Sequence, residues 1–325
     1  MNLNDALARG YLNVKPPTPQ IIEVDRTIVL GDGDETKTCA SFGLRLVGNG
    51  HGPNAAEMSP WGGATLLRWV GPAVDASGKP SVVVKVAGPV AACEVGGFTI
   101  DCNGVAGVGL ELQHPMESRI HDILIANPGK IGVWMHGVRT GGGATVATVA
   151  MNCCWNWIER VSVFVQAAGT VGWEVGVGDD TKTWGVSRNV FMQCAVQGTG
   201  VVGQVGWRLR GCDSNYWVFR ESFDCETPLL MDTPMDATYP GQFPYANHGV
   251  MDYLWPPVKN PWLPAVRWAK GWNPWNVGAV FENPIQESAG KGVDGKELYY
   301  PAVVEVEGNE RALIWQGVRE KGKEG

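Results

Sequence analysis

Short apolar runs alternate with glycine, asparagine, aspartate and proline from residue 21 to the end of the chain. The runs are rich in Val, Ile, Leu, Phe and Trp, and helical periodicity is almost absent. β-branched and aromatic runs bounded by turn residues predict strands. Only residues 2–12 carry a helix pattern, with Asn4 as its cap. A proline-rich stretch at residues 14–20 follows, and it predicts an extended linker.

A four-residue pattern of glycine, apolar, polar and apolar residues recurs through this region. Its strong and weak copies begin at Gly109, Gly132, Gly172, Gly206, Pro228, Ala265 and Ala302. The successive offsets are 23, 40, 34, 22, 37 and 37 residues, and a second apolar run follows most copies. A repeat of this length built from strands predicts a solenoid of stacked turns. The shortest offsets fit one bare turn, and the longer ones predict loop insertions near residues 138–150, 176–183 and 232–264.

Stacked turns place equivalent residues in columns about 4.8 Å apart. The first apolar column is Leu110, Val133, Trp173, Trp207, Val266 and Val303. The second is Leu112, Met135, Val175, Leu209 and Trp268, with Glu305 as an exception. The column between them is Glu111, Trp134, Glu174, Arg208, Arg267 and Val304. Strand alternation predicts that the two apolar columns face the core and the middle column faces outward, with Glu174 near Arg208.

Three stretches carry a resemblance to a known family: SFGLRLVGNGHGP with GGATLLRWVG, VGGFTIDCNGVAGVGLEL, and SRIHDILIANPGKIGVWM. They resemble the opening turns of pectate-lyase-like parallel β-helices, and more narrowly those of bacteriophage tailspikes and virion fibre proteins. The similarity covers residues 21–320 and is clearest over residues 42–135. It implies an all-β, right-handed, single-stranded parallel β-helix (a pectin-lyase-like solenoid) at residues 21–325, behind an N-terminal arm at residues 1–20. GDGDETKTCAS, at residues 31–41, matches only part of the family's capping turn.

Charge and hydropathy exclude several classes of function. The formal net charge is -7 without a basic block, which argues against a nucleic-acid partner. No apolar run approaches the roughly 20 residues of a membrane helix, and the first residues lack a signal-peptide pattern. The eight cysteines lack zinc spacing and are expected to be buried thiols. Cys194 and Cys225 fall in one column of the second runs, and we expect thiols there too.

The remaining motifs predict neither a cofactor nor a metal. GTGVVG at residues 198–203 matches a dinucleotide fingerprint, but a strand pattern follows it where that motif requires a helix. GDGDET lacks most ligands of a calcium loop. The histidines show no metal or triad spacing; they are His51, His114, His121, His136 and His248.

Carboxylates of the second runs are the candidate catalytic groups. The weak candidates are Glu159, Glu221 and Asp224. Glycoside hydrolysis needs two carboxyl groups about 5 Å or about 6.5–9.5 Å apart. The column of Asp122 is expected to continue as Arg160, Asn189 and Glu221, which puts no two carboxylates side by side. A salt-bridged ladder explains these charges at least as well. Whether the protein is an enzyme stays open, and an enzyme of this kind would be a polysaccharide lyase or a glycoside hydrolase.

Tryptophan is unusually frequent, with 15 residues. Four of them lie in or beside a proline-rich segment: Trp255, Trp262, Trp272 and Trp275. Exposed indoles stack on sugar rings, anchor subunit interfaces or pack locally, and the sequence leaves all three open.

The resemblance and the missing catalytic pattern predict a virion-associated spike, fibre or decoration protein that presents a surface to host glycans. We expect a homotrimer, made in the host cytoplasm and joined to the virion through its N-terminal arm. A secreted polysaccharide-degrading lyase or hydrolase is one alternative, and a purely structural capsid or tail component is another.

Overall fold

The computed structural model describes five long segments and a set of short strands. The segments are residues 20–33, 41–51, 65–138, 153–176 and 183–231. The short strands are residues 248–250, 253–255, 266–268, 280–282, 288–291, 297–299, 304–306 and 314–316. All described elements are strands or turns, and no described helix is long and apolar enough to span a bilayer.

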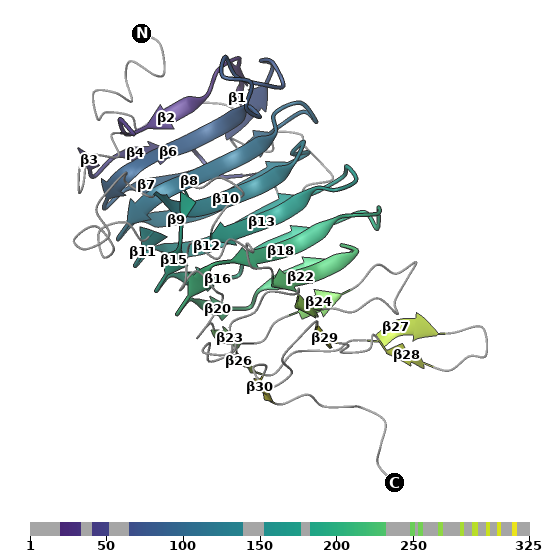
Figure 1. Ribbon diagram of the computed structural model, residues 1–325. Helices are drawn as coiled ribbons and strands as arrows, with labels where there is room; N and C mark the ends of the chain where they lie inside the picture. The colour runs from purple at the N-terminus through teal and green to yellow at the C-terminus, as the bar shows by residue number, and fades with distance from the viewer. Residues whose placement is uncertain are drawn as a thin grey trace.

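The strands form two 14-stranded sheets and a separate hairpin of β27 (Ser288–Lys291) and β28 (Glu297–Tyr299) (Figure 1). Sheet A follows the order β1 (Gln20–Val24), β5 (Thr65–Trp69), β7 (Glu94–Asp101), β9 (Arg119–Ala126), β12 (Trp157–Phe164), β16 (Val190–Met192), β20 (Tyr216–Val218), β23 (His248–Val250), β26 (Val280–Glu282) and β30 (Ile314–Gln316). Beside this path lie β4 (Arg45–Val47), β17 (Ala195–Gln197), β21 (Glu221–Phe223) and β24 (Tyr253–Trp255).

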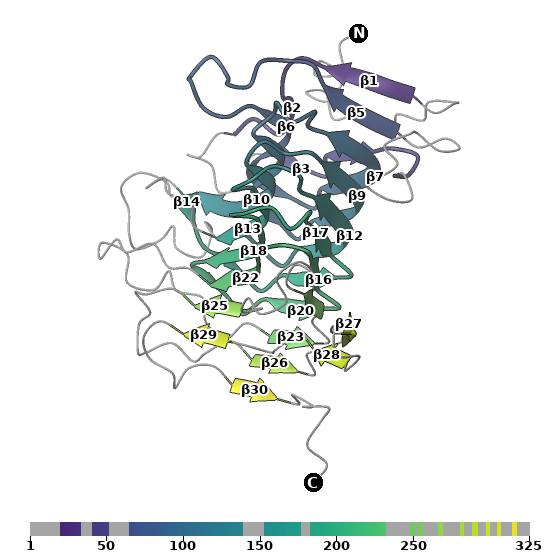
Figure 2. The same ribbon diagram turned by 90° about the vertical axis from the view of Figure 1, so that its right-hand side faces the viewer.

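Sheet B lies against sheet A, and the two appear as two stacks of strands in Figure 2. Its central strands are β6 (Val82–Ala91), β8 (Val108–Met116), β10 (Ile131–Val138), β13 (Val171–Gly176), β18 (Val205–Arg210), β22 (Thr227–Met231), β25 (Val266–Trp268) and β29 (Val304–Val306). Its shorter members are β2 (Ile28–Leu30), β3 (Ser41–Phe42), β11 (Cys153–Cys154), β14 (Thr183–Trp184), β15 (Val186–Ser187) and β19 (Cys212–Asp213).

The chain passes back and forth between the two sheets, with one or more consecutive strands in each, so each turn of chain contributes to both. β6 in sheet B leads to β7 in sheet A, then β8 in sheet B and β9 in sheet A. Neighbouring turns pair in parallel, except that β14 runs antiparallel to β10 among the described strands of the two sheets. The chain is therefore a parallel β-helix, which confirms the predicted fold class.

The predicted columns of sheet B hold over most of the coil. Leu110 pairs with Val133, Val133 with Trp173, and Trp173 with Trp207. The prediction was one residue out at the last copy, because Val304 rather than Val303 pairs with Val266. Val306 therefore takes the place expected for Glu305. The alternation of Val304, Glu305 and Val306 fits the observed register, whereas the prediction aligned Ala302 with the glycine column and so placed Glu305 in an apolar column.

The glycines of the repeat lie where sheet B turns against sheet A. A Cβ atom added at Gly132 would overlap Val163, and one at Gly172 would overlap Val196. Both valines belong to sheet A and point into the coil. The glycine of each turn is thus required by the close approach of the two sheets rather than by backbone conformation.

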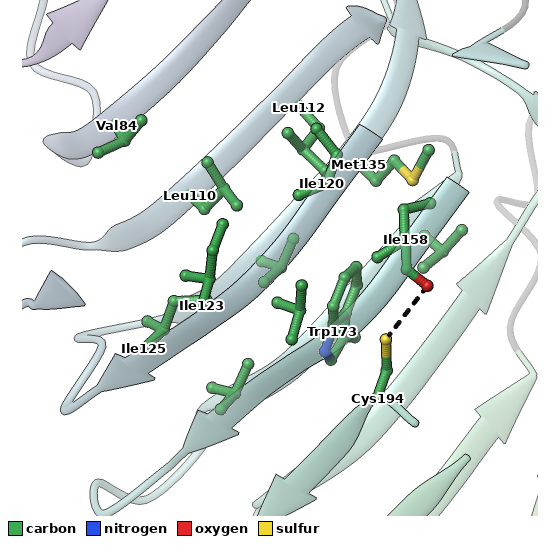
Figure 3. Packing of buried hydrophobic residues seen from close by; sticks show 14 of the residues in the cluster. Val84, Leu110, Leu112, Ile120, Ile123, Ile125, Met135, Ile158, Trp173 and Cys194 are labelled. Atoms are coloured by element: carbon green, nitrogen blue, oxygen red, sulfur yellow. Dashed lines mark hydrogen bonds between the residues drawn. The ribbon is translucent and has the colours of Figure 1, made fainter. Parts of the chain in front are cut away.

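Stacked apolar side chains fill the interior, as Figure 3 shows for Leu110, Ile123 and Trp173 among others. Trp173 and Trp207 stack with ring centroids 4.9 Å apart. Farther along, Phe191 stacks on Trp217 at 5.2 Å. Aromatic residues of neighbouring turns therefore stack on one another, because the parallel register places equivalent positions side by side.

The seven described cysteines are buried and form no disulfide, which confirms the thiol prediction for them, and Cys39 lies outside the described residues. The predicted column of Cys194 and Cys225 is wrong, because Ala195 pairs with Glu221 and Cys194 therefore lies opposite Arg220. Cys194 donates a hydrogen bond to the carbonyl of Ile158 on the adjacent turn, at 3.8 Å (Figure 3).

A ladder of buried asparagines forms the corner between sheet B and sheet A. Asn156 donates from Nδ2 to Oδ1 of Asn189 at 2.8 Å, and Asn189 does the same to Asn215 at 2.9 Å. The residue before each asparagine has a positive φ, with 58° at Trp155 and 58° at Arg188. The ladder satisfies backbone groups that the corner removes from water. The sequence analysis did not identify it.

The predicted insertions lie largely outside the described residues, as do most of the arm and residues 317–325. The described part of the segment 232–264 corrects one prediction. Residues 248–250 and 253–255 form β23 and β24, which pair with β20 and β21 and continue sheet A. This is the second strand of the turn that begins at Pro228. The sequence pattern did not predict this strand, because its apolar runs are short and prolines lie on both sides of them.

Candidate functional site

The outer face of sheet A carries a column of residues with left-handed backbone. The column contains Gly97, Asp122, Arg160, Gln193 and Phe219, all with positive φ. A left-handed residue breaks the alternation of a strand, as in a β-bulge. Two successive side chains, such as those of Glu159 and Arg160, then both lie on the outer face. The same break divides the later turns into β16 and β17, and into β20 and β21.

A cavity of about 350 Å³ lies beside this column, across three neighbouring turns. Its lining residues are His51, Arg160, Ser162, Gln193, Ala195, Phe219 and Glu221. Ser162 pairs with Ala195, and Ala195 pairs with Glu221, so these three form the next outward column along the strands. The volume lies at the lower end of the roughly 300–1,000 Å³ that is common for ligand pockets.

Glu221 is the carboxylate that this cavity exposes. Within the described part of the chain, its carboxylate forms no hydrogen bond and no ion pair. Partial burial raises the pKa of Glu221 above its usual value, because desolvation disfavours the charged form. The side chains of Gln193 and Ser162 likewise have no hydrogen-bond partner among the described residues. The cavity thus presents a carboxylate, an amide and a hydroxyl that a ligand can bind.

Arg160 is held in place by two carboxylates. It donates from Nε to Oδ1 of Asp122 at 2.6 Å and from Nη2 to Oδ2 at 3.0 Å. Nη2 also lies 3.2 Å from Oε1 of Glu159. The hydrogen bond from Arg160 is the largest reason that the pKa of Asp122 falls to about 2. The guanidinium is therefore oriented before any ligand arrives.

The carboxylate of Glu159 takes part in a network of hydrogen bonds and ion pairs. Burial alone would raise its pKa, but hydrogen bonds from Arg119 and Trp157 and the charge of Arg160 outweigh it, and the pKa lies below its usual value. Trp157 donates from Nε1 to Oε2 of Glu159 at 3.2 Å. A carboxylate with these partners is ionised and shielded, which does not suit a catalytic acid.

The network continues away from the cavity through His121. Its Nδ1 lies 2.8 Å from Oδ2 of Asp122 and its Nε2 lies 3.2 Å from Oε1 of Glu94. Both ring nitrogens face carboxylate oxygens, and which of them donates depends on the tautomer. Asp122 is thereby held from both sides.

The predicted catalytic carboxylates are therefore separated. Glu221 lines the cavity, Glu159 is tied to arginines, and Asp224 occupies a turn with φ of 52°, where its carbonyl accepts a hydrogen bond from Gly200 N. The predicted continuation of the Asp122 column through Asn189 and Glu221 is wrong. The column continues through Gln193 and Phe219, as the pairing of β12 with β16 and β17 shows.

Sequence reasoning missed the other lining residues for the same reason. Arg160, Ser162, Gln193 and Phe219 meet only because each turn contains a left-handed residue that shifts the register by one. Such residues leave little trace in a hydrophobic pattern.

The outer face of sheet B holds a second set of charges. Glu174 lies 3.6 Å from Arg208 and 3.5 Å from Arg210, which confirms the predicted pair with Arg208. Glu111 lies 2.8 Å from Lys85 Nζ and 3.2 Å from His136 Nε2. The middle column faces away from the core as predicted, although neighbouring side chains bury Glu111 and Glu174. No group of three or more potential metal ligands occurs among the described residues.

Of the four predicted tryptophans, only Trp255 lies in a described element. It ends β24 and pairs with Phe223 of β21. Trp262, Trp272 and Trp275 lie outside the described residues, so their role stays a prediction.

Comparisons with known proteins add a limited finding. No protein-family model matches the chain, and no curated protein matches it. One similar solved structure is ORF18 of Geobacillus virus E2, with a TM-score of 0.43 and 10% identity over 87% of this chain and 53% of that one. The catalytic domain of Agl-KA gives 0.34 and 11%, over 97% of this chain and 64% of that one. An alginate lyase from Paenibacillus sp. str. FPU-7 gives 0.35 and 13%, over 97% and 95%.

This chain thus spans 53% and 64% of the first two structures. At these TM-scores none of the three carries an argument about function. The assignment to the parallel β-helix class rests on the chain's own strand pairing.

Proposed function

We propose that this protein is a virion-associated β-helix that holds a host glycan against the outer face of sheet A. One observation carries the proposal: the cavity presents Glu221, Gln193 and Ser162 without hydrogen-bond partners among the described residues, beside an oriented Arg160. A sugar offers hydroxyl groups that donate and accept, and these four side chains complement them. Phe219 adds an apolar surface for the ring.

The location on the coil supports an extended ligand. Apart from His51, the lining residues come from three successive turns, about 4.8 Å apart, so a chain of sugars that crosses the strands meets the same columns repeatedly. The virion role is supported by the sequence resemblance of residues 42–135 alone. Attachment through the arm and a trimeric state belong to the same proposal.

Binding to an array of bacterial surface polysaccharides tests the function. We expect the full chain to bind a subset of glycans, and Ser162→Ala with Gln193→Ala to weaken that binding by about tenfold, because each removes a hydrogen bond from a desolvated site. Ser77→Ala is the matched control, since Ser77 bonds only locally in an exposed turn. Absence of binding by the unaltered protein would exclude the proposal.

A second candidate function is polysaccharide cleavage, which one observation favours. Glu221, with its raised pKa, shares the cavity with His51 and Arg160. A carboxyl group with a raised pKa suits a general acid, an imidazole can act as a base, and a guanidinium can neutralise a uronate. New reducing ends or unsaturated uronates, formed by the protein and abolished in Glu221→Gln, would support cleavage. Binding without products would leave attachment as the function.

A further inference from the structure

Two exposed aromatic residues lie on the same outer face as the cavity, in one column of sheet A. Trp157 pairs with Val190, and Val190 pairs with Tyr216. Trp157 is 44% exposed and Tyr216 is 41% exposed. Among the other described tryptophans, Trp155 is also exposed, whereas Trp69, Trp173, Trp207 and Trp217 are buried. We call Trp157 and Tyr216 the aromatic pair.

The indole of Trp157 is fixed in orientation. Its Nε1 donates to Glu159 at 3.2 Å, and Glu159 is held in turn by Arg119 and Arg160. A large apolar ring that is both exposed and anchored loses little conformational entropy when a ligand covers it. The hydrogen bond to Glu159 thus distinguishes Trp157 from an exposed tryptophan whose ring rotates freely.

The geometry of the pair fits a ligand that crosses the strands. Two strand spacings, about 10 Å in total, separate Trp157 from Tyr216. Three residues along β12, again about 10 Å, separate Trp157 from Arg160 at the edge of the cavity. The pair and the cavity therefore belong to one continuous surface.

The chemistry around the pair favours a sugar over a protein partner. Aromatic faces are electron-rich, and the polarised C–H groups on one side of a pyranose ring pack against them. Arg119 precedes Trp157 in the column and is half-exposed, while Trp155 nearby faces the guanidinium of Arg188 at 5.9 Å. Val190 lies between Trp157 and Tyr216, and the charged side chains of Arg119 and Arg188 border this column. Among the described residues the apolar surface is therefore a narrow stripe rather than the broad apolar area of a stable subunit interface.

We propose that Trp157 and Tyr216 form a stacking subsite for the pyranose rings of a glycan that runs along the axis of the coil. This inference rests on the proposed function, and it names the ring face of the sugar, rather than its hydroxyl groups alone, as what is recognised. The aromatic pair supplies affinity and the cavity supplies selectivity.

Calorimetric titration of the full chain with unbranched hexasaccharides of glucose, mannose, galactose and galacturonate tests the subsite. We expect at least one to bind, with affinity about tenfold weaker in Trp157→Ala and in Tyr216→Ala. Trp157→Phe, which keeps a ring but loses the N–H, should retain most of the affinity. Phe42→Ala, which removes a 72% exposed ring from sheet B, should bind like the unaltered protein.

The outcomes separate this inference from the proposed function. Unchanged affinity in both alanine variants, together with loss in the Ser162 and Gln193 variants, would overturn the aromatic subsite and leave the function standing. Dissociation of an oligomer in Trp157→Ala, measured by sedimentation, would instead assign the pair to a subunit interface and overturn the subsite. No binding of any hexasaccharide by the unaltered protein would overturn the function and the subsite together.

Discussion

Arg160 donates two hydrogen bonds, of 2.6 and 3.0 Å, to the carboxylate of Asp122, although 38 residues separate the two in the chain. Both have left-handed backbone, with φ of 50° and 52°. They are neighbours in one column of the coil, so the pair connects the fold to the cavity. The parallel pairing of β9 with β12 places the two left-handed residues side by side. The same pairing orients the guanidinium of Arg160, which lines the cavity.

This pair predicts an acid-dependent loss of stability. The pKa of Asp122 is lowered from about 3.8 to about 2, so its contribution is present above pH 3.8 and is lost as the pH falls through 2. Because both groups are partly exposed, we expect about 1 kcal/mol. Urea unfolding of Asp122→Asn and the unaltered protein at pH about 6 and about 2.5 measures it. A difference between the two proteins that does not change with pH would contradict the pairing.

Glu221 predicts a pH dependence of the opposite sign. Burial raises its pKa in the folded protein, so the protonated form is stabilising and that contribution is lost as the pH rises through the folded value. Glu221→Gln should therefore be slightly more stable than the unaltered protein at neutral pH, by less than about 1 kcal/mol. Chemical denaturation at neutral pH is the measurement. A destabilised variant would indicate that the carboxylate has a partner.

The asparagine ladder predicts a large cost for a small substitution. Asn189→Ala removes the acceptor for Asn156 and the donor to Asn215, and also leaves the carbonyls of Cys153 and Ser187 without that donor. Buried groups left unsatisfied cost about 1–3 kcal/mol each, so we expect a loss of at least 3 kcal/mol in unfolding free energy. Ser118 precedes Asn156 in the ladder: its backbone N donates to Oδ1 of Asn156 at 3.0 Å, and its hydroxyl accepts from Cys93 N at 3.0 Å. Ser118→Ala should therefore cost about 1 kcal/mol. Equal costs would argue against a continuous ladder.

The glycine column predicts a specific rescue. Gly132→Ala should destabilise the coil by about 1–3 kcal/mol, because the new Cβ overlaps Val163. The second substitution Val163→Ala makes room, so the double variant should be more stable than the sum of the two single effects implies. Thermal unfolding of the four proteins completes the cycle. Strict additivity would mean that the two sheets do not meet at these residues.

Much of this architecture is predictable from the sequence because a coil repeats its own pattern. The columns through Leu110 and Leu112 follow from strict alternation next to glycine, and the structure keeps that register from β8 to β18. The prediction was one residue out at the copy that begins with Ala302, because Ala302 was aligned with the glycine column although Val304, Glu305 and Val306 alternate. β23 and β24 were not predicted either, because their apolar runs are short and flanked by prolines.

The site was less predictable than the fold, for a physical reason. One column of sheet A has left-handed backbone on each of these turns, and this conformation is available to Asp122, Arg160, Gln193 and Phe219 alike. No residue type marks it, so the expected column ran from Arg160 to Asn189 in place of Gln193. Glu221 was predicted as a candidate carboxylate. The hydroxyl of Ser162, the amide of Gln193 and the ring of Phe219 were placed beside it only by the structure.

Hydroxyl-radical footprinting with and without the best-bound polysaccharide reports which side chains the glycan covers. If the glycan lies on the outer face of sheet A, oxidation of Trp157, Tyr216 and Phe219 should fall several-fold on binding, while that of Phe42 on sheet B stays constant. Protection confined to sheet B or to the β27–β28 hairpin, with Trp157 and Phe219 unchanged, would contradict a glycan site on the outer face of sheet A.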